Sequence, residues 1–232
     1  MQLSHRDDHV EIDPAILYFG TPVVLVGTRN ADGTPNLAPI SSAFWLGRRG
    51  VIGLGSSSHS LANLRRERAC VLNLPSADQA DAVDALALTT GAEPVPEGKR
   101  AKGYRHEADK FGVAGLTPLP GRSVDAPRAA ECPVQLEARV AAFRSLAEDD
   151  PEERGRIWTV EVEVVRVHVA AEIRVPGRPN RVDPDRWRPM IMSFQKYYGL
   201  GPQLRASTLA SIDEDLYRPA ASPPAPVATP SR

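Results

Sequence analysis

The part of the sequence with the clearest chemical potential is a run of small and hydroxyl residues, Gly-Leu-Gly-Ser-Ser-Ser-His-Ser, at residues 53–60. It leads from a strand-like segment into residues 60–69, which are rich in helix formers. The start of a helix presents backbone N–H groups without partners and carries partial positive charge. A phosphate dianion satisfies both, and Gly55 leaves room for its approach. The alternative is a serine-rich turn with an ordinary N-cap, and this segment alone does not decide between the two.

The segments before and after this turn have the composition of β-strands. Residues 21–29 are rich in β-branched residues, and Asp32-Gly33 follows them as a hairpin signal. We therefore expect residues 35–46 to return as one strand. Residues 50–55 are expected to form a third short strand, and residues 71–74 a buried one.

The second half of the chain predicts one more helix and two long strands. Ser76 and Gln79 form a possible capping box for a helix that continues to Leu88. Residues 92–130 are rich in Pro and Gly, and a connection of this length inside a domain is usually functional. Residues 133–145 and 157–173 have strand character, whereas the chain after Arg174 is expected to be irregular.

Many strands and few helices predict a mainly β protein with an antiparallel sheet or barrel. The chain has neither a strand–helix alternation nor a GxGxxG sequence, which argues against a Rossmann domain. We expect one domain over residues 1–217. Residues 218–232 form a Pro/Ala-rich tail whose composition is typical of disorder.

Composition and charge exclude several classes of partner. The 232-residue chain has a formal net charge of −1, so its total charge gives no case for nucleic acid or an acidic membrane surface. No apolar run approaches the roughly 20 residues that span a bilayer, and the charged N-terminus does not resemble a signal peptide. Cys70 and Cys132 are expected to be buried thiols in a reducing compartment, which favours the cytoplasm. His168, without a suitably spaced second ligand, is expected to be structural, and we predict no metal.

Several segments, in order along the chain, resemble the flavin reductase-like, FMN-binding split-barrel family, the flavoredoxin-like proteins. The resemblance extends from about Tyr18 to about Leu209. It implies an antiparallel split β-barrel of the FMN-binding type. The segments that carry it are residues 21–28 (TPVVLVGT), 32–36 (DGTPN), 56–63 (SSSHSLAN), 109–117 (DKFGVAGLT), 131–133 (ECP) and 188–190 (RPM).

The resemblance also implies positions for the flavin phosphate. The residues matching the family's phosphate-binding loop are Ser56, Ser57, Ser58 and Ser60, with Ser60 in place of the usual Thr, and Asn63 matches a common Asn. His59 lies among them and is a candidate phosphate contact, although an exposed histidine at a helix start is equally consistent with the sequence.

Other positions match the surroundings of the flavin ring. Asn36 and Ala38 fall where the family lines the ring and the ribityl chain, and Ser42 falls where members often carry an aromatic residue. Lys110 matches a lysine near the pyrimidine edge, where a cation stabilises the negative charge of reduced flavin and raises its potential. The resemblance implies that Phe194 and Tyr198 lie near the isoalloxazine, in the same subunit or contributed by the partner subunit. The alternative, from the residue types alone, is that both are aromatic residues of the core.

The resemblance implies an NAD(P)H-dependent flavin reductase-like oxidoreductase that works as a homodimer. NADH or NADPH would donate a hydride to the flavin, and the electrons would continue to a monooxygenase or another acceptor. Such a reaction needs no side chain as acid or base, so we predict no catalytic residue. FAD is possible in place of FMN. The alternatives are a non-catalytic FMN-binding electron carrier or flavin sensor, and a split barrel that has lost its flavin.

Overall fold

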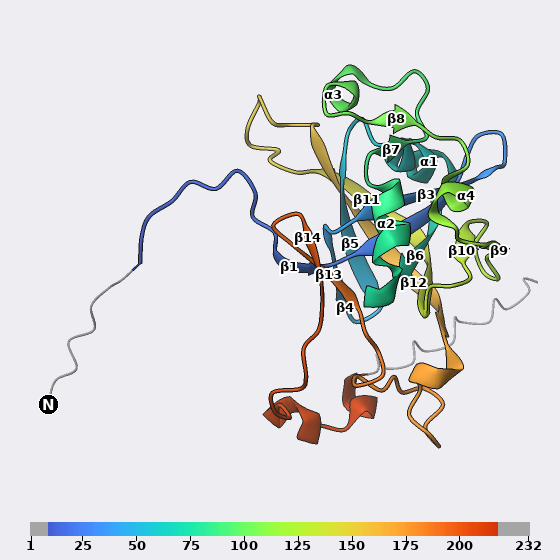
Figure 1. Ribbon diagram of the computed structural model, residues 1–232, viewed down its shortest axis with the longest axis vertical. Helices are drawn as coiled ribbons and strands as arrows, with labels where there is room; N and C mark the ends of the chain where they lie inside the picture. The colour runs from blue at the N-terminus through green and yellow to red at the C-terminus, as the bar shows by residue number, and fades with distance from the viewer. Residues whose placement is uncertain (1–8, 218–232) are drawn as a thin grey trace, which may run out of the picture.

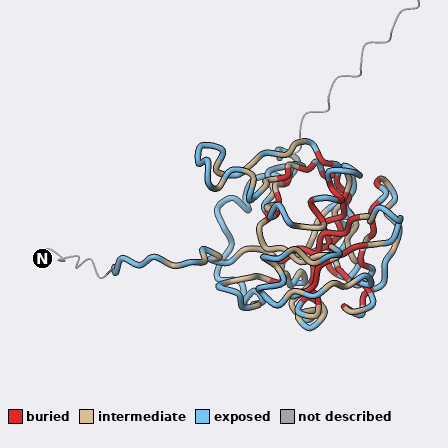
Figure 2. The backbone as a smooth tube through the Cα atoms, turned by 90° about the horizontal axis from the view of Figure 1, so that it is seen from above, coloured by how far each residue is buried: buried red, intermediate tan, exposed pale blue. Residues whose placement is uncertain are grey.

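The computed structural model describes residues 9–217. The predicted tail at residues 218–232 lies outside the described residues, and the division into one domain and a tail stays a prediction. Buried residues concentrate in the strands at the centre of the molecule, while the segment that precedes the first strand is mostly exposed (Figure 2).

The centre of the fold is a seven-stranded antiparallel sheet in the order β3-β2-β6-β11-β12-β5-β4 (Figure 1). Its edge strands, β3 and β4, follow each other in the chain and are joined by only Ser41 and Ser42. The sheet therefore curls until its two edges are close, yet β3 and β4 do not pair, which makes a split barrel. This confirms the predicted mainly β, antiparallel split β-barrel. The strands are β2 (Val24–Arg29), β3 (Pro35–Ile40), β4 (Ala43–Leu46), β5 (Arg49–Gly55), β6 (Ala69–Leu74), β11 (Val134–Ser145) and β12 (Ile157–Val169).

The prediction of a single strand over residues 35–46 is wrong. The chain bends at Ser41 and Ser42, so that β3 pairs with β2 while β4 pairs with β5. The bend is held by the N–H of Gly53, which donates to the Ser42 carbonyl at 2.8 Å. A local apolar pattern does not reveal this bend because the partners that impose it come from elsewhere in the sequence.

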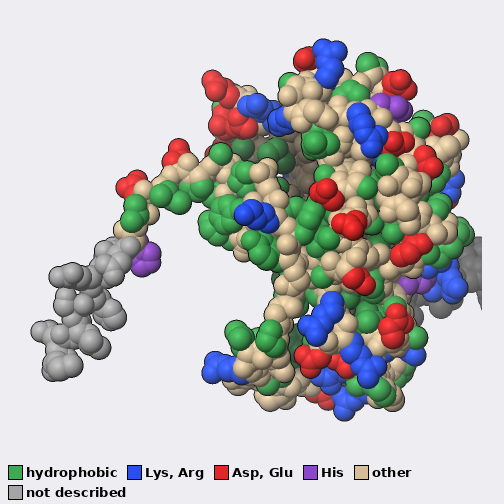
Figure 3. Space-filling model, viewed as in Figure 1, with side chains coloured by type: hydrophobic (Ala, Val, Ile, Leu, Met, Phe, Trp, Pro, Cys, Tyr) green, Lys and Arg blue, Asp and Glu red, His purple; other side chains and the backbone are tan. Residues whose placement is uncertain are grey.

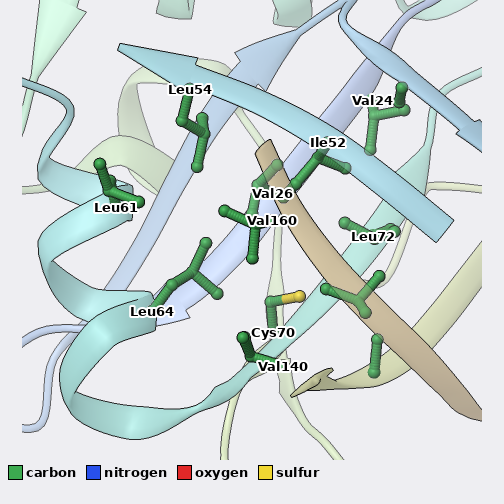
Figure 4. Close-up of a cluster of buried hydrophobic side chains, with 13 residues drawn as sticks. Val24, Val26, Ile52, Leu54, Leu61, Leu64, Cys70, Leu72, Val140 and Val160 are labelled. Carbon is green, nitrogen blue, oxygen red and sulfur yellow. The ribbon is translucent and has the colours of Figure 1, made fainter. Parts of the chain in front are cut away.

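The interior of the barrel is apolar and is closed at one end by helix α1 (His59–Glu67). Leu61 and Leu64, three residues apart on one face of α1, are fully buried against the strands (Figure 4). This packing fixes where α1 begins. The other buried residues of this cluster are Val24, Val26, Ala43, Ile52, Leu54, Cys70, Leu72, Ala138, Val140, Val160 and Val162.

A second core lies between the outer face of β2 and β3 and two helices, α2 (Ala80–Leu86) and α4 (Lys110–Ala114). Leu25 and Leu37 alternate with the barrel-facing residues and pack here against Leu86 and Phe111. A one-turn 3-10 helix, Ala77–Gln79, precedes α2, and the N–H of Ser76 donates to Gln79 Oε1 at 2.9 Å, as one half of the predicted capping box.

The predicted helix through Leu88 ends at Leu86, because the next residues form strand β7 (Thr89–Thr90), which pairs with β8 (Arg105–His106). Between them lies α3 (Glu97–Arg100). The loop-rich region also contains the paired strands β9 (Pro118–Pro120) and β10 (Pro127–Ala129). The long connection is therefore built from short elements packed on the barrel.

A buried carboxylate holds the end of this connection to the sheet. Glu137 on β11 accepts hydrogen bonds from the N–H groups of Arg122, Ser123 and Val124 and contacts Nε2 of His168. Burial favours the neutral acid, but these donors outweigh it and lower the pKa of Glu137 to about 2. His168 thus lies in a structural contact, as expected.

The region after β12 corrects a second expectation. The strand predicted to Ile173 ends at Val169, and residues Ala171–Ile173 form a 3-10 turn. The expected irregular segment after Arg174 contains a hairpin, β13 (Met190–Ser193) and β14 (Lys196–Gly199), which pairs with β1 (Phe19–Pro22) as a three-stranded sheet. Two 3-10 helices follow, Thr208–Ser211 and Glu214–Tyr217.

The two cysteines lie in the cores as free thiols, as predicted. Cys70 is inside the barrel, and Cys132 belongs to the second core. Burial raises the pKa of each thiol to about 12. Within residues 9–217, no helix is long and apolar enough to cross a bilayer.

Candidate anion-binding site

The serine-rich segment folds as the turn that leads from β5 into α1. Ser58 is the N-cap, and its Oγ accepts the N–H of Leu61 at 3.4 Å. The N–H groups of Ser57, His59 and Ser60 have no acceptor among the described residues. Because Leu61 is anchored in the barrel, these three donors are held at one place, which suits an anion.

Beneath the turn lies a buried polar network that joins α1 to β2 and β3. The amide nitrogen of Asn36 donates to Thr28 Oγ1 at 2.9 Å and to Ser60 Oγ at 3.2 Å. The amide nitrogen of Asn63 donates to Thr28 Oγ1 at 3.1 Å and to Asn30 Oδ1 at 3.0 Å. Buried amides and hydroxyls are costly unless they are paired, so this network fixes Ser60 and leaves its hydroxyl hydrogen available.

His59 connects the turn to the β2–β3 hairpin. Its Nε2 lies 2.8 Å from Asn30 Oδ1. Burial, reinforced by the positive charges of Lys110 and Arg66, lowers the pKa of His59 below its ordinary value of 6.5. The imidazole is therefore neutral at pH 7, and Nε2–H donates to Asn30. A Cβ on Gly91 would lie 2.6 Å from His59 Cδ2, so only glycine fits there.

Lys110 is the most unusual ionisable residue near the turn. It begins α4, its side chain contacts Thr89 Oγ1, and it is only 1% exposed. Burial, with Lys99 adding to it and Glu107 opposing it, lowers the pKa of Lys110 from 10.5 to about 8. Among the described residues no carboxylate lies within 4.0 Å of its ammonium. The site thus holds a desolvated cation that lacks an anionic partner.

The structure brings most of the predicted residues together. Asn36, His59, Ser60 and Asn63 share one network. Lys110 contacts Thr89, and Gly91, two residues further along the chain, lies against His59. Ser56, Ser57 and Ser58 lie on the same turn. Ala38 is two residues after Asn36 on β3, so it shares the same face of that strand.

Three predicted residues lie elsewhere. Ser42 is at the bend between β3 and β4, where its Oγ is 3.2 Å from the hydroxyl of Tyr18. Phe194 and Tyr198 belong to the β13–β14 hairpin, away from α1 in the same chain (Figure 1). Phe194 instead meets the ring of Phe19 edge-on at 4.7 Å between centroids.

Sequence reasoning missed several residues that build the site. Thr28 and Asn30 hold the network together, and the Thr89–Thr90 strand supplies acceptors to Lys110 and Lys99. Thr28 gave a usable signal, because a polar residue in an otherwise apolar strand is usually paired. The Thr89–Thr90 strand gave none, since its pairing partners, Arg105 and His106, lie 16 positions further along the chain.

These features define a split-barrel protein whose serine turn presents unpaired N–H groups near a buried cation without an anionic partner. Residues 16–201 match the flavin reductase like domain family. The chain therefore belongs to the flavin reductase-like family, which supports a flavin-binding or flavin oxidoreductase role and confirms the resemblance seen in the sequence.

Several individual proteins are similar to this chain in sequence or in fold. The chain is 36% identical over 194 residues to the uncharacterized protein YdfE of Bacillus subtilis, covering 84% of this chain and 90% of that one. Flavoredoxin of Desulfovibrio vulgaris matches in structure with a TM-score of 0.69 at 20% identity, over 88% of this chain and all of that one. Nitrilotriacetate monooxygenase component B of Bacillus cereus matches with a TM-score of 0.67 at 17% identity, over 87% and 100% of the two chains.

The buried ammonium of Lys110 leads to a prediction about stability in the absence of ligand. Its pKa in the folded chain, about 8, is below the unfolded value of 10.5. The unfolded chain therefore binds this proton more tightly, so the ammonium destabilises the fold below pH 8, and this cost disappears as pH rises from 8 to 10.5. We expect Lys110→Met to raise the free energy of unfolding at pH 7 by on the order of 2 kcal/mol, with a smaller gain at pH 10.

Urea unfolding of flavin-free protein at the two pH values measures this difference. Arg205→Met, at an exposed cation outside the candidate site and outside the β1–β13–β14 sheet, is the matched control and should change neither value. A Lys110→Met protein that is less stable than the wild type at pH 7 would contradict the prediction.

Proposed function

We propose that this protein is an FMN-dependent oxidoreductase that takes a hydride from NADH or NADPH and passes the electrons to an acceptor. The observation that carries the proposal is the combination of three unpaired N–H groups at the start of α1 with the buried, unpaired ammonium of Lys110. A phosphate dianion and an electron-rich ring edge are the two groups that such donors suit.

The turn is proposed to hold the phosphate. The N–H groups of Ser57, His59 and Ser60 face its oxygens, and the hydroxyls of Ser56, Ser57, Ser58 and Ser60 surround it. Asn63 acts one step away, because it shares Thr28 with the Asn36 amide that binds Ser60. Because the network already holds the hydroxyl and N–H donors of the turn in place, less conformational entropy is lost when the phosphate binds.

The ring and the ribityl chain are proposed to extend along β3. Asn36 and Ala38 line them, Ser42 lies at the far end, and Lys110 faces the pyrimidine edge. Bound flavin supplies the redox chemistry, and the protein supplies placement. Lys110 stabilises negative charge at this edge, and its low exposure keeps water from screening that interaction. No side chain is required as a general acid or base.

The electron acceptor is proposed to be a partner monooxygenase or another electron acceptor. The structural likeness to nitrilotriacetate monooxygenase component B supports this choice. The free, buried thiols of Cys70 and Cys132 agree with a reducing compartment, and we propose the cytoplasm. We propose no metal for this reaction.

Visible spectroscopy of the purified protein tests the proposed activity. We expect a yellow protein, or one that binds added FMN, whose flavin absorbance bleaches when NADH or NADPH is added without oxygen. FMN binding without bleaching by either donor would favour the non-catalytic electron carrier or sensor. A colourless protein that does not bind FMN would contradict the proposal and identify a barrel that has lost its flavin.

The phosphate position is tested by charge. Ser57→Asp with Ser60→Asp places two negative charges at the turn, and we expect FMN affinity to fall at least about a hundredfold, which is on the order of 3 kcal/mol. Flavin fluorescence titration measures the affinity. Because Ser60 is buried, the exposed Ser57→Asp alone serves as a second variant whose fold is not at risk.

The matched control for this test is Ser207→Asp with Ser211→Asp, which adds the same charge on an exposed 3-10 turn. This control should bind FMN as the wild type does. Undiminished FMN affinity in both Ser57 variants, with circular dichroism showing an intact fold, would place the phosphate elsewhere.

We also propose a homodimer formed through the β1–β13–β14 sheet. Several large apolar residues of this sheet and its surroundings are exposed, and green side chains gather there in Figure 3. Phe194 has a backbone φ of 44°, a conformation that costs free energy in a bulky residue. The second subunit would cover these residues. Phe194 and Tyr198 of one subunit would then lie near the flavin of the other subunit. The exposed residues are Leu17, Phe19, Phe194, Tyr198 and Leu200.

Light scattering tests the dimer. We expect twice the 25.1 kDa chain mass at micromolar concentration. Phe194→Asp should shift the protein toward monomer, because Asp tolerates the left-handed conformation but cannot pack in an apolar interface. A monomeric wild-type mass would contradict the proposal.

A further inference from the structure

The hydroxyl of Thr89 can act only as an acceptor toward Lys110. Thr89 lies on β7 and is 8% exposed. Its Oγ1 lies 2.8 Å from the carbonyl oxygen of Leu86 and is also in contact with Nζ of Lys110. Because a carbonyl oxygen only accepts, the single hydroxyl hydrogen is donated to Leu86. The lone pairs of Oγ1 are therefore left for the ammonium.

The ammonium of Lys110 has three N–H groups and one acceptor. Among the described residues, Thr89 Oγ1 is the only acceptor in hydrogen-bond contact with it. Neither Lys110 nor Lys99 has a carboxylate within 4.0 Å in this part of the chain. The charges that act on it come from Lys99, Glu107 and Arg105. Two of its N–H groups thus have no partner within the described residues.

The backbone holds Thr89 in place beside the serine turn. Thr89 is in register with Arg105 of β8. Two residues further, Gly91 packs so closely against His59 that a Cβ would not fit. The ammonium of Lys110, by contrast, lies at the end of a flexible four-carbon chain. A fixed hydroxyl is therefore the group that can locate the end of this side chain.

We propose that Thr89 is a positioning residue for the flavin, and that it acts by holding the ammonium of Lys110 in one place. This inference rests on the proposed function, in which Lys110 faces the pyrimidine edge. One N–H of the ammonium donates to Thr89, and the other two are left for the ligand. The attraction between the ammonium and the negative charge of reduced flavin weakens as their separation grows. By keeping the ammonium in place, the hydroxyl of Thr89 raises the potential of the flavin.

The midpoint potential of bound FMN tests this role. Thr89→Val keeps the branched shape and removes the acceptor, whereas Thr89→Ser keeps the hydroxyl. We expect Thr89→Val to lower the preference for reduced over oxidised FMN about tenfold, which makes the potential about 30 mV more negative for a two-electron couple. Thr89→Ser should keep the wild-type potential. The matched control is Thr159→Val on β12, whose Oγ1 donates to the Arg144 carbonyl at 3.3 Å, and it should change nothing.

A double-mutant cycle tests whether Thr89 acts through Lys110. Lys110→Met leaves no ammonium to position, so adding Thr89→Val to it should not shift the potential further. A shift that persists undiminished in the Lys110→Met protein overturns the inference, because the hydroxyl would then act on the flavin by another route. An unchanged potential in Thr89→Val alone overturns it as well.

The flavin-free protein reports on the same contact without any ligand. The hydrogens of a buried, hydrogen-bonded ammonium exchange slowly with water. At pH 6, below the pKa of Lys110 of about 8, we expect a heteronuclear NMR signal for this ammonium that Lys110→Met removes. Its exchange rate should rise at least about tenfold in Thr89→Val, as expected for loss of one hydrogen bond to a charged group, and should stay near the wild-type value in Thr89→Ser.

Failure of this inference is therefore distinguishable from failure of the proposed function. A protein that binds FMN, with equal potentials and equal exchange rates in the wild type and Thr89→Val, keeps the proposed function and loses only the role of Thr89. A protein that does not bind FMN contradicts the proposed function, and its exchange rates still decide whether Thr89 holds Lys110.

Discussion

The packing of α1 into the end of the barrel is the interaction on which the candidate site depends. Leu61 and Leu64 are buried with strands from both halves of the sheet, so the beginning of α1 has a fixed position. The unpaired N–H groups of Ser57, His59 and Ser60 follow from that position, because a helix cannot satisfy its own first donors. The apolar packing of Leu61 and Leu64 thus positions the unpaired N–H groups at the start of the same helix.

Strand β2 connects this core to the rest of the site. Its alternating side chains enter both cores, with Val24 and Val26 inside the barrel and Leu25 against α2 and α4. Thr28 continues the barrel-facing series, but at the end of the strand it meets Asn36 and Asn63 instead of apolar residues. The second core holds α4, and with it Lys110, against the same strand. The serine turn and the lysine therefore share one support.

The sequence predicted what depends on local pattern and missed what depends on distant partners. The serine turn, the helix after it and the long antiparallel strands each have a composition that is typical of one kind of secondary structure. The bend at Ser42, by contrast, depends on Gly53 of the neighbouring strand β5, whose N–H donates to the Ser42 carbonyl. The β13–β14 hairpin turns through Phe194 and Gln195, which lack the Gly or Asn of usual tight turns. The threonines and lysines between β7 and α4 become a site only when this connection packs beside α1.

Two lysines near the turn, Lys99 and Lys110, show why a fold can retain charge that does not stabilise it. Lys99 and Lys110 have lost water without gaining a carboxylate, and their lowered pKa values record that loss. An internal salt bridge would relieve this cost, but the carboxylate would then compete with any external anion. Because the cations stay unpaired, they can still attract an external anion. An anion that binds the folded chain but not the unfolded chain raises the free energy of unfolding by mass action and so offsets the lost stability. On this argument the binding energy and the marginal stability of the empty site have the same physical origin.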